Sequence, residues 1–280
     1  MYKSMNLYVL LLSLFLFSFV DGNKKKSDLE LDHIHGQVKA IHLYDYKRAD
    51  QKTLAIDPAK ITLPDTTKHM IYNYDKNGNL AEHTNSDGKK LEVYSYNNSG
   101  YRIHSVNYNI KGKILSEATY TYDMDGNVIE NKNLTYKKDT IILTNTFKND
   151  DKGVPQEMNV YSKNKFLYKW LFKYNDKGIK IEESKYYPKD SLAEKWVYKY
   201  DDKGNKTEMA MYNDSLVEKF VYTYNDSHDV TEDILYGRLG RLYHDYVYNY
   251  TYDEKGNWNK KVFYEGSTLK GVTIRVIEYY

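Results

Sequence analysis

Six glutamates recur at the same place in a repeated pattern, and they are the closest this sequence comes to a source of catalytic chemistry. Paired carboxylates flank the scissile bond in glycoside hydrolysis, so a glycosidase is one candidate function. An active site is usually a single exception within a scaffold, whereas this carboxylate returns in most copies of the pattern. We therefore expect structural glutamates that bind tyrosine hydroxyls and lysines along a sheet. They are Glu82, Glu130, Glu157, Glu182, Glu208 and Glu232.

Other signatures of an enzyme or a metal site are absent from the sequence. The 280 residues contain no cysteine, no Gly-x-Ser-x-Gly, no His-Glu-x-x-His and no phosphate-binding glycine loop. His33 and His35 could ligate zinc from one strand face. We expect instead that both histidines face solvent near the frayed start of the mature chain. Asp123-Met-Asp125-Gly126 resembles a calcium loop only faintly, because the further acidic ligands are missing. The sequence predicts no enzyme, no metal site and no cofactor.

Tyrosine is the outstanding residue type, with 32 copies in 280 residues. Its ring packs well on a pleated, half-buried surface, and an exposed ring can stack on a sugar or a partner side chain. A stripe of paired tyrosines is therefore the predicted binding surface, for a glycan or a protein at the cell surface. Its members are Tyr72, Tyr74, Tyr94, Tyr96, Tyr120, Tyr122, Tyr198, Tyr200, Tyr222, Tyr224, Tyr250 and Tyr252.

These tyrosines belong to a phrase that recurs eight times: aromatic, any residue, aromatic, Asp or Asn, two residues, Gly. The first copy runs from Tyr72 to Gly78, the fourth is weaker, and His228 takes the glycine place in the seventh. An Asp or Asn side chain binds backbone N–H groups ahead of it and Gly can take positive φ, so the phrase predicts a tight turn. Successive glycine places are 22 to 28 residues apart. That period fits two strands of roughly 8 residues and two turns of roughly 4.

We therefore predict an all-β fold, an elongated, curved antiparallel meander of tandem β-hairpin repeats. Neighbouring hairpins would stabilise one another in a solenoid-like single sheet. With a bulged turn, the aromatic six residues before Gly would lie opposite the glutamate four after it, so tyrosines and glutamates would share one face. The other face would carry Asn73, Lys148, Lys173 and Lys199. Such a face argues against the continuous apolar surface of a membrane barrel.

The N-terminus has the features of a secretory signal, with Lys3 ahead of an apolar run over residues 7–20. The run is shorter than the roughly 20 residues of a membrane-spanning helix, although a retained anchor is the alternative. We place cleavage after Gly22 and expect a secreted, periplasmic or cell-surface protein, with membrane contact only through the removed signal. Residues 23–67 are predicted to form an N-terminal cap strand, over 36–46, and a loop. Residues 68–280 hold the eight repeats.

The distribution of charge bears on the possible partners, and the cysteine content bears on what stabilises the fold. The 41 basic and 39 acidic residues are spread along the chain, so no clustered basic face for nucleic acid is expected. The absence of cysteine means that no disulfide holds the fold, although an exported protein could form them. Packing and backbone hydrogen bonds must supply the stability.

The phrase resembles the YD repeats of RHS-type bacterial proteins, whose signature is Tyr-x-Tyr-Asp-x-x-Gly-Asn-x-x-Glu. The segments 72–82, 120–130 and 198–208 match it closely, and the resemblance covers residues 68–280. In large members it implies a long sheet that winds into a shell around a toxin. This chain has about eight repeats, no self-cleavage motif and no toxin domain after them. It looks like a short, free-standing exported member, for which the resemblance implies a surface or envelope location.

Together these observations predict an exported, non-catalytic surface or envelope repeat protein that binds a glycan or protein partner or has a structural role. An accessory or shell-like protein of a toxin or secretion system is the alternative nearest to the resemblance. A glycosidase is a second alternative. An outer-membrane barrel is a third, suggested by the aromatic C-terminus and about 18 short strands.

Overall fold

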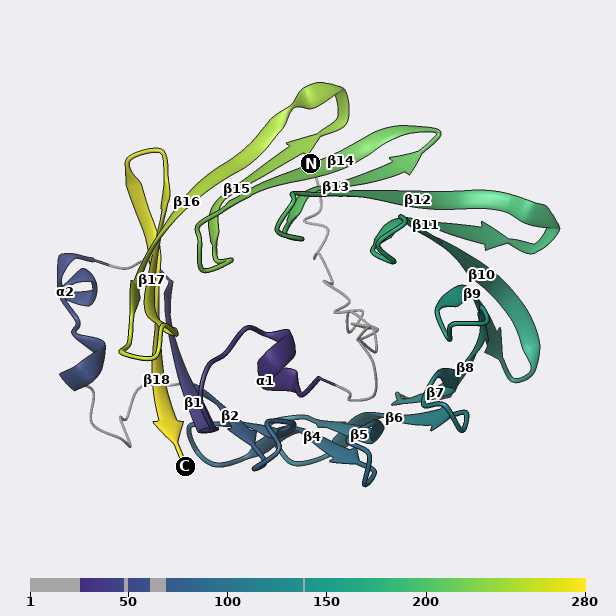
Figure 1. The fold of residues 1–280 in the computed structure, drawn as a ribbon, viewed down its shortest axis with the longest axis horizontal. Helices are drawn as coiled ribbons and strands as arrows, with labels where there is room; N and C mark the ends of the chain where they lie inside the picture. Colours follow the sequence, from purple (N-terminus) through teal and green to yellow (C-terminus); the bar gives the residue numbers. More distant parts are fainter. Residues whose placement is uncertain (1–25, 48–49, 61–68, 138) are drawn as a thin grey trace.

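The computed structural model describes residues 26–47, 50–60, 69–137 and 139–280, so the predicted signal and its cleavage after Gly22 lie outside the described residues. In this part of the chain, antiparallel strands dominate and the helices are short (Figure 1). The helices are α1 (Asp28–Leu31), α2 (Gln51–Leu54), η1 (Pro58–Lys60), η2 (Pro188–Asp190) and η3 (Arg238–Gly240). The first nine strands are β1 (Val38–Lys47), β2 (Met70–Tyr74), β3 (Leu80–Asn85), β4 (Lys90–Tyr96), β5 (Arg102–Tyr108), β6 (Ile114–Tyr122), β7 (Val128–Tyr136), β8 (Thr140–Asn149) and β9 (Pro155–Ser162). The other nine are β10 (Lys165–Tyr174), β11 (Lys180–Tyr187), β12 (Ser191–Tyr200), β13 (Lys206–Asn213), β14 (Ser215–Tyr224), β15 (Val230–Gly237), β16 (Leu242–Tyr252), β17 (Trp258–Glu265) and β18 (Thr268–Tyr279).

The sheet closes into a barrel of 18 strands, which corrects the expectation of an open, solenoid-like sheet. From β2 to β18 each strand pairs antiparallel with the next, as the hairpin repeats predict. The first strand then lies between the two ends: Ile41 pairs with Ile277 of β18 on one side and with Tyr72 of β2 on the other. Closure removes both sheet edges, which in an open meander would expose unpaired N–H and C=O groups.

The turns of the repeated phrase form as predicted. In the first copy Gly78 N donates to Asp75 O at 3.0 Å, and the Asp75 carboxylate accepts from the backbone N–H groups of Asn77 and Asn79. Gly78 has φ +80°, a conformation that a Cβ disfavours. His228, which replaces glycine in the seventh copy, adopts the same left-handed conformation with φ +65°.

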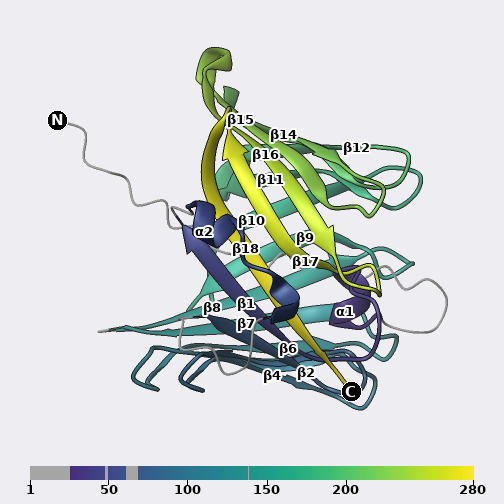
Figure 2. The same cartoon turned by 90° about the vertical axis from the view of Figure 1, so that its left-hand side faces the viewer.

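The barrel has distinct inner and outer faces. Helix α1 lies inside the ring, and α2 lies outside against β1 and β18 (Figures 1 and 2). Because side chains alternate along a strand, residues that contact α1, such as Tyr74 and Tyr96, mark the inward positions. Outward positions are marked by Tyr44, which packs in a cluster with Leu54 and Ile56.

The predicted shared face of tyrosines and glutamates is wrong. The bulge at each turn places Lys173, not Phe172, opposite Glu182, while Phe172 lies opposite Glu183. The recurring glutamates therefore face outward, and four of the six form ion pairs with lysines, as in Lys173–Glu182 at 2.8 Å and Lys199–Glu208 at 3.0 Å. The tyrosines of the phrase face inward.

Apolar packing is concentrated in three places. Leu29 and Ile34, from α1 and the segment after it, pack inside the barrel against Val38, Ile41 and Tyr74. A second inner cluster holds Val128, Phe147, Met158, Val160 and Trp170. The third, around Tyr44, Val272 and Ile274, lies outside beneath α2. Among the described residues, no helix has the length and apolar content needed to cross a membrane.

Candidate ligand-binding lumen

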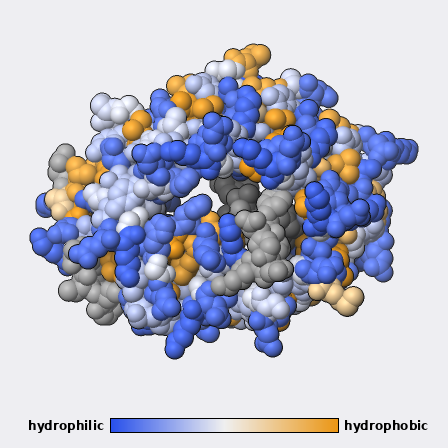
Figure 3. All heavy atoms as spheres, in the orientation of Figure 1, coloured by the Kyte–Doolittle hydropathy of each residue, from blue (hydrophilic) through white to orange (hydrophobic). Residues whose placement is uncertain are grey.

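All twelve tyrosines of the predicted binding stripe lie on the inner wall of the barrel. Strand registers place Tyr120 opposite Asn131, Tyr198 opposite Met209 and Tyr222 opposite Asp233, all on the inward face. Figure 3 shows a hollow at the centre of the ring. The residues of the predicted binding stripe are therefore gathered on the inner wall, around the hollow that we call the lumen.

The second tyrosine of most phrases has a structural task. Its hydroxyl donates to the backbone carbonyl oxygen two residues beyond the turn of the preceding copy. Tyr122 binds Arg102 O at 2.7 Å, and Tyr200 binds Lys180 O at 2.9 Å. In the weaker fourth copy Asn149 replaces the tyrosine, and its side-chain amide donates to the equivalent carbonyl, Val128 O. The same bond is made by Tyr96 to Leu80 O, Tyr174 to Pro155 O, Tyr224 to Lys206 O and, from the first tyrosine of its phrase, Tyr250 to Val230 O.

These bonds fix every repeat to its neighbour and satisfy polar groups inside the wall. Burial raises the pKa of Tyr122 and of Tyr200 to about 12, so both hydroxyls stay protonated and remain donors at neutral pH. The first tyrosines of the phrases, such as Tyr120 and Tyr222, stand one inward position further along their strands. The available ring surface of the lumen comes mainly from them.

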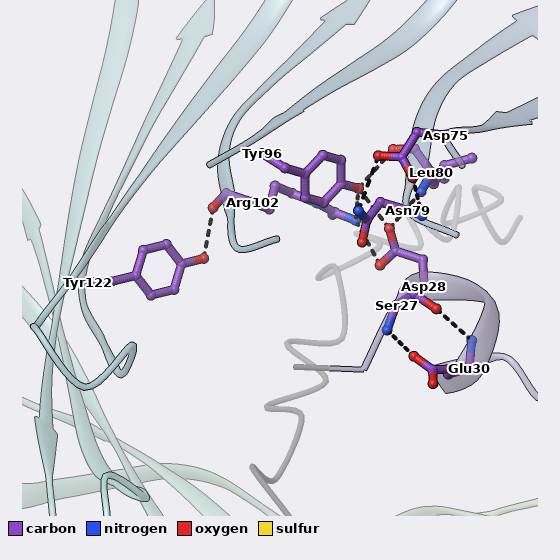
Figure 4. A network of polar contacts seen from close by, with 9 residues as sticks. All are labelled: Ser27, Asp28, Glu30, Asp75, Asn79, Leu80, Tyr96, Arg102 and Tyr122. Atoms are coloured by element: carbon purple, nitrogen blue, oxygen red, sulfur yellow. Dashed lines mark hydrogen bonds and ion pairs between the residues drawn. The ribbon is translucent and has the colours of Figure 1, made fainter. Parts of the chain in front are cut away.

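Helix α1 is fixed to the inner wall by one carboxylate (Figure 4). Asp28 Oδ2 accepts from Tyr96 Oη at 2.7 Å and from Leu80 N at 2.8 Å, and Asp28 Oδ1 lies 3.5 Å from the Arg102 guanidinium. A capping box between Ser27 and Glu30 starts the helix. Helix α1 thus attaches to the first two repeats.

The same segment attaches to the last repeats further along. His35 N donates to Asn257 Oδ1 at 2.8 Å, and Asn257 Nδ2 donates back to His35 O at 2.9 Å. His33 stacks on His228 with ring centroids 5.2 Å apart. Within the described ranges, no group of three or more His, Cys, Asp or Glu side chains is arranged to hold a metal. Residues 26–37 therefore bridge the two ends of the repeat array.

Charged side chains also project into the lumen, mostly as pairs. Lys180 contacts Glu183 at 2.5 Å, and Glu183 accepts from Tyr198 Oη at 2.6 Å. Lys185 lies 3.6 Å from Glu194. Burial, followed by repulsion from Lys180, lowers the pKa of Lys206, whose ammonium lies 4.9 Å from the Tyr198 ring centroid. Aromatic rings and ion pairs together give a polar wall that can offer stacking faces and hydrogen bonds.

Three lumen residues of the last repeat were not singled out from the sequence: Trp258, Lys261 and Arg275. Trp258 follows the turn of the eighth phrase, and Arg275 lies on β18 two positions before Ile277. Tyr250 on β16 faces inward, and the strand register pairs it with Lys261 on β17. Lys261 therefore also faces inward. The alternation of residues along β16 is visible in the sequence. The register that pairs Tyr250 with Lys261 depends on the bulged turns, which the alternation does not reveal.

The outer wall carries charge at mid-height. Lys132, Lys169, Lys195 and Lys219 each lie in the middle of a strand, and their cross-strand partners share the outward face. Asn73, Lys148, Lys173 and Lys199 also face outward, opposite the tyrosines as predicted. A lysine at the bilayer midplane of a membrane barrel costs about 2–4 kcal/mol. This outer surface does not form the apolar band of such a barrel.

A depression of about 860 Å³ lies at the rim, between α1 and the turns of the first two repeats. It is lined by Ser27, Glu30, Asp75, Tyr94 and Asn97, among others. Among the described residues, no group of three or more His, Cys, Asp or Glu side chains is arranged there to hold a metal. Two tyrosines of the predicted stripe, Tyr94 and Tyr96, belong to its lining, so the depression adjoins the aromatic interior.

No protein-family model and no curated protein matches this chain. Among solved structures, it is similar to a porin-like protein from Bacteroides uniformis, at 10% identity and a TM-score of 0.38 over 86% of this chain and 98% of that one. A porin-like protein from Bacteroides vulgatus gives 12% identity and 0.39 over 88% and 99%. A Photorhabdus luminescens Tc holotoxin pore, with the TccC3 component, gives 13% identity and 0.31 over 76% of this chain, which spans 15% of that chain.

Proposed function

We propose that this chain is a non-catalytic, exported β-barrel that binds an oligosaccharide inside its tyrosine-lined lumen. One observation carries the proposal: the predicted aromatic stripe faces a single enclosed space, where a ligand can contact several rings at once. Aromatic faces stack on the apolar faces of sugar rings, and several weak contacts in one space add up. The recurring glutamates, the only candidates for paired catalytic carboxylates from the sequence, face outward, and four of the six bind lysines.

The outer wall supports an aqueous setting for the barrel. Four mid-strand lysines would each lie in hydrocarbon if this surface spanned a bilayer, at a cost of about 2–4 kcal/mol per residue. We therefore infer a secreted, periplasmic or cell-surface location after removal of the signal. The outer-membrane alternative predicts an uncharged belt that these strands lack.

The test is binding of neutral oligosaccharides to the mature chain, first on an array and then by calorimetry. The variants are Tyr222→Ala and Tyr248→Ala, because neither hydroxyl makes a hydrogen bond to the described residues. Burial raises the pKa of Tyr248 to about 12, so this side chain is neutral under the assay conditions. The matched control is Tyr212→Ala on the outer wall, where the ring faces Lys195. We expect each lumen variant to weaken binding about tenfold, in line with about 1–2 kcal/mol per aromatic contact. Binding that survives both lumen changes, or an array with no binder, would refute the proposal.

The position of α1 favours a second candidate ligand. A segment of the chain itself already lies inside the ring and is bound there through Asp28, Tyr96 and Arg102. A barrel that holds its own polypeptide could also hold a peptide from a partner, which is the shell-like alternative. A peptide array probed with the same lumen variants separates the two candidates.

A further inference from the structure

Two cations share one indole on the inner wall of β17 and β18. The Arg275 guanidinium carbon lies 3.5 Å from the centroid of the Trp258 ring, and the Lys261 ammonium lies 5.5 Å from it. Register places both cations inward, since Lys261 pairs with Tyr250 on one side and Thr273 on the other. Both side chains are half-buried. The wall therefore presents two like charges side by side, with an aromatic surface beneath them.

Within the described ranges, neither cation has an anionic partner at ion-pair distance. Among the residues that the structure describes, no carboxylate lies within 4.0 Å of Arg275 or Lys261, and neither side chain donates a hydrogen bond to the protein. The other lumen cations differ: Arg102 is paired with Asp28, Lys180 with Glu183, and Lys185 with Glu194. Lys206 also lacks an ion pair among the described residues, with Glu183 in its field. Arg275 and Lys261 differ from Lys206 because they are two cations on one ring, with no carboxylate of the described residues at ion-pair distance from either.

An uncompensated cation pair is unfavourable for the empty barrel. Burial, and then repulsion from Arg275, lowers the pKa of Lys261, and burial lowers that of Arg275. Asp32, Asp45 and Asp229 contribute to the field at these groups but do not reach ion-pair distance. Partly desolvated charges are normally paired, because an unpaired one loses hydration without gaining a partner. Residues that lower the stability of the folded state in this way are commonly retained because they bind a ligand.

We infer that Arg275 and Lys261 bind an anionic group, a carboxylate or a sulfate, carried by an acidic oligosaccharide in the lumen. The guanidinium offers a planar fork that can donate two hydrogen bonds to such a group, and the ammonium offers a second charge. Trp258 lies beneath them and holds the guanidinium against its ring face. This inference deepens the proposed function and rests on it: the lumen holds the sugar, and the cation pair selects for an acidic one.

Calorimetric titration of the mature chain with a uronic-acid oligosaccharide and a neutral oligosaccharide of equal length tests the selectivity. We expect the acidic ligand to bind at least about tenfold more tightly, and Arg275→Gln or Lys261→Gln to remove that advantage, as loss of a charge-assisted hydrogen bond implies. The charge control is Lys219→Gln on the outer wall, which should leave both affinities unchanged. Equal affinity for the two ligands would overturn the anion site while leaving the lumen function intact.

Titration with sodium sulfate alone tests the site independently of any sugar. The indole N–H signal of Trp258, assigned by its loss in Trp258→Phe, should shift with sulfate in the wild type and in Lys219→Gln but not in Arg275→Gln. A shift without oligosaccharide binding would support the anion site and overturn the oligosaccharide function. No shift in the wild type would overturn the site, because a small doubly charged anion should reach it.

Thermal unfolding distinguishes a binding role from a structural one. If the two cations serve a ligand, Lys261→Met removes an unpaired charge, and the midpoint should stay unchanged or rise. Sulfate should raise the midpoint of the wild type more than that of Lys261→Met, because a ligand of the folded state stabilises it. A clear fall of the midpoint in Lys261→Met, with equal sulfate effects, would show that Lys261 is a structural residue.

Discussion

The hydroxyl of Tyr200 donates to the backbone carbonyl oxygen of Lys180, 2.9 Å away and one hairpin earlier in the barrel. The bond recurs around the wall, and it appears at the closure as well, where Tyr280 donates to Tyr74 O at 2.7 Å. The second aromatic of the phrase is thus a connector between repeats. This explains why the phrase carries tyrosine there, since phenylalanine would fill the same space without the donor.

Tyr200→Phe should lower the free energy of unfolding by about 1–2 kcal/mol. The substitution keeps the ring but leaves the Lys180 carbonyl without this partner. Chemical denaturation followed by circular dichroism measures the change. Tyr212→Phe on the outer wall is the control and should be neutral. Equal losses in the two variants would mean that the hydroxyl bond contributes nothing specific.

Substitution of the turn glycines should reveal two separate costs. Gly204 has φ +86° and open space around the position of a Cβ, so Gly204→Ala should cost about 1–2 kcal/mol from backbone strain alone. At Gly126, φ +85°, a Cβ would approach the Tyr101 hydroxyl oxygen to 2.2 Å and displace a ring that packs on Tyr122. Gly126→Ala should therefore unfold at lower denaturant concentration than Gly204→Ala. The reverse order would contradict the packing of Tyr101.

Breaking the attachment of α1 should destabilise the barrel. Asp28→Asn leaves the half-buried Arg102 guanidinium without its carboxylate and weakens the acceptor for Tyr96. We expect the free energy of unfolding to fall by about 2–3 kcal/mol. This is less than the loss of a fully buried ion pair would cost, because both groups retain some solvent contact. The control is Asp226→Asn, which removes the exposed Lys203–Asp226 pair and should change stability little. Protection of the β1 amides from hydrogen exchange should fall in Asp28→Asn alone.

The barrel should lose stability as pH rises from about 10 to about 12. Burial raises the pKa of Tyr122, Tyr200 and Tyr248 to about 12, whereas tyrosine in the unfolded chain titrates near 10. In that window the unfolded state releases protons that the folded state retains, so ionisation favours unfolding; below pH 10 this stabilisation is fully present. Tyrosinate absorbance and circular dichroism should change together in one transition. Smooth ionisation with the fold intact at pH 12 would contradict the buried hydroxyls.

The mature protein should begin at Asn23. Signal cleavage after Gly22 leaves only a few residues ahead of α1, which is consistent with a helix that is held inside the barrel from its first turn. Intact-mass measurement on protein recovered from culture medium or envelope extract tests this. Recovery of the uncleaved chain from membranes would favour a retained anchor.

Sequence alone was sufficient for features that depend on near neighbours. The turn from Asp75 to Gly78 follows from one side-chain acceptor and one residue free to take positive φ, so it could be predicted from four residues. The antiparallel hairpins follow from the alternation and the period between turns. The charged face opposite the tyrosines was also readable, because Lys173 alternates with Phe172 and Tyr174.

Tertiary structure decided the features that depend on distant pairing. Whether β1 meets β18 depends on the summed twist and bulges of the strands between them, and no local pattern encodes that sum. Closure turned a stripe expected on an open sheet into the wall of a lumen. It also made Trp258, Lys261 and Arg275 part of that enclosed wall. The turn bulge moved Glu182 to the outer face by a shift of a single residue, and because side chains alternate, such a shift reverses the face of every residue that follows it.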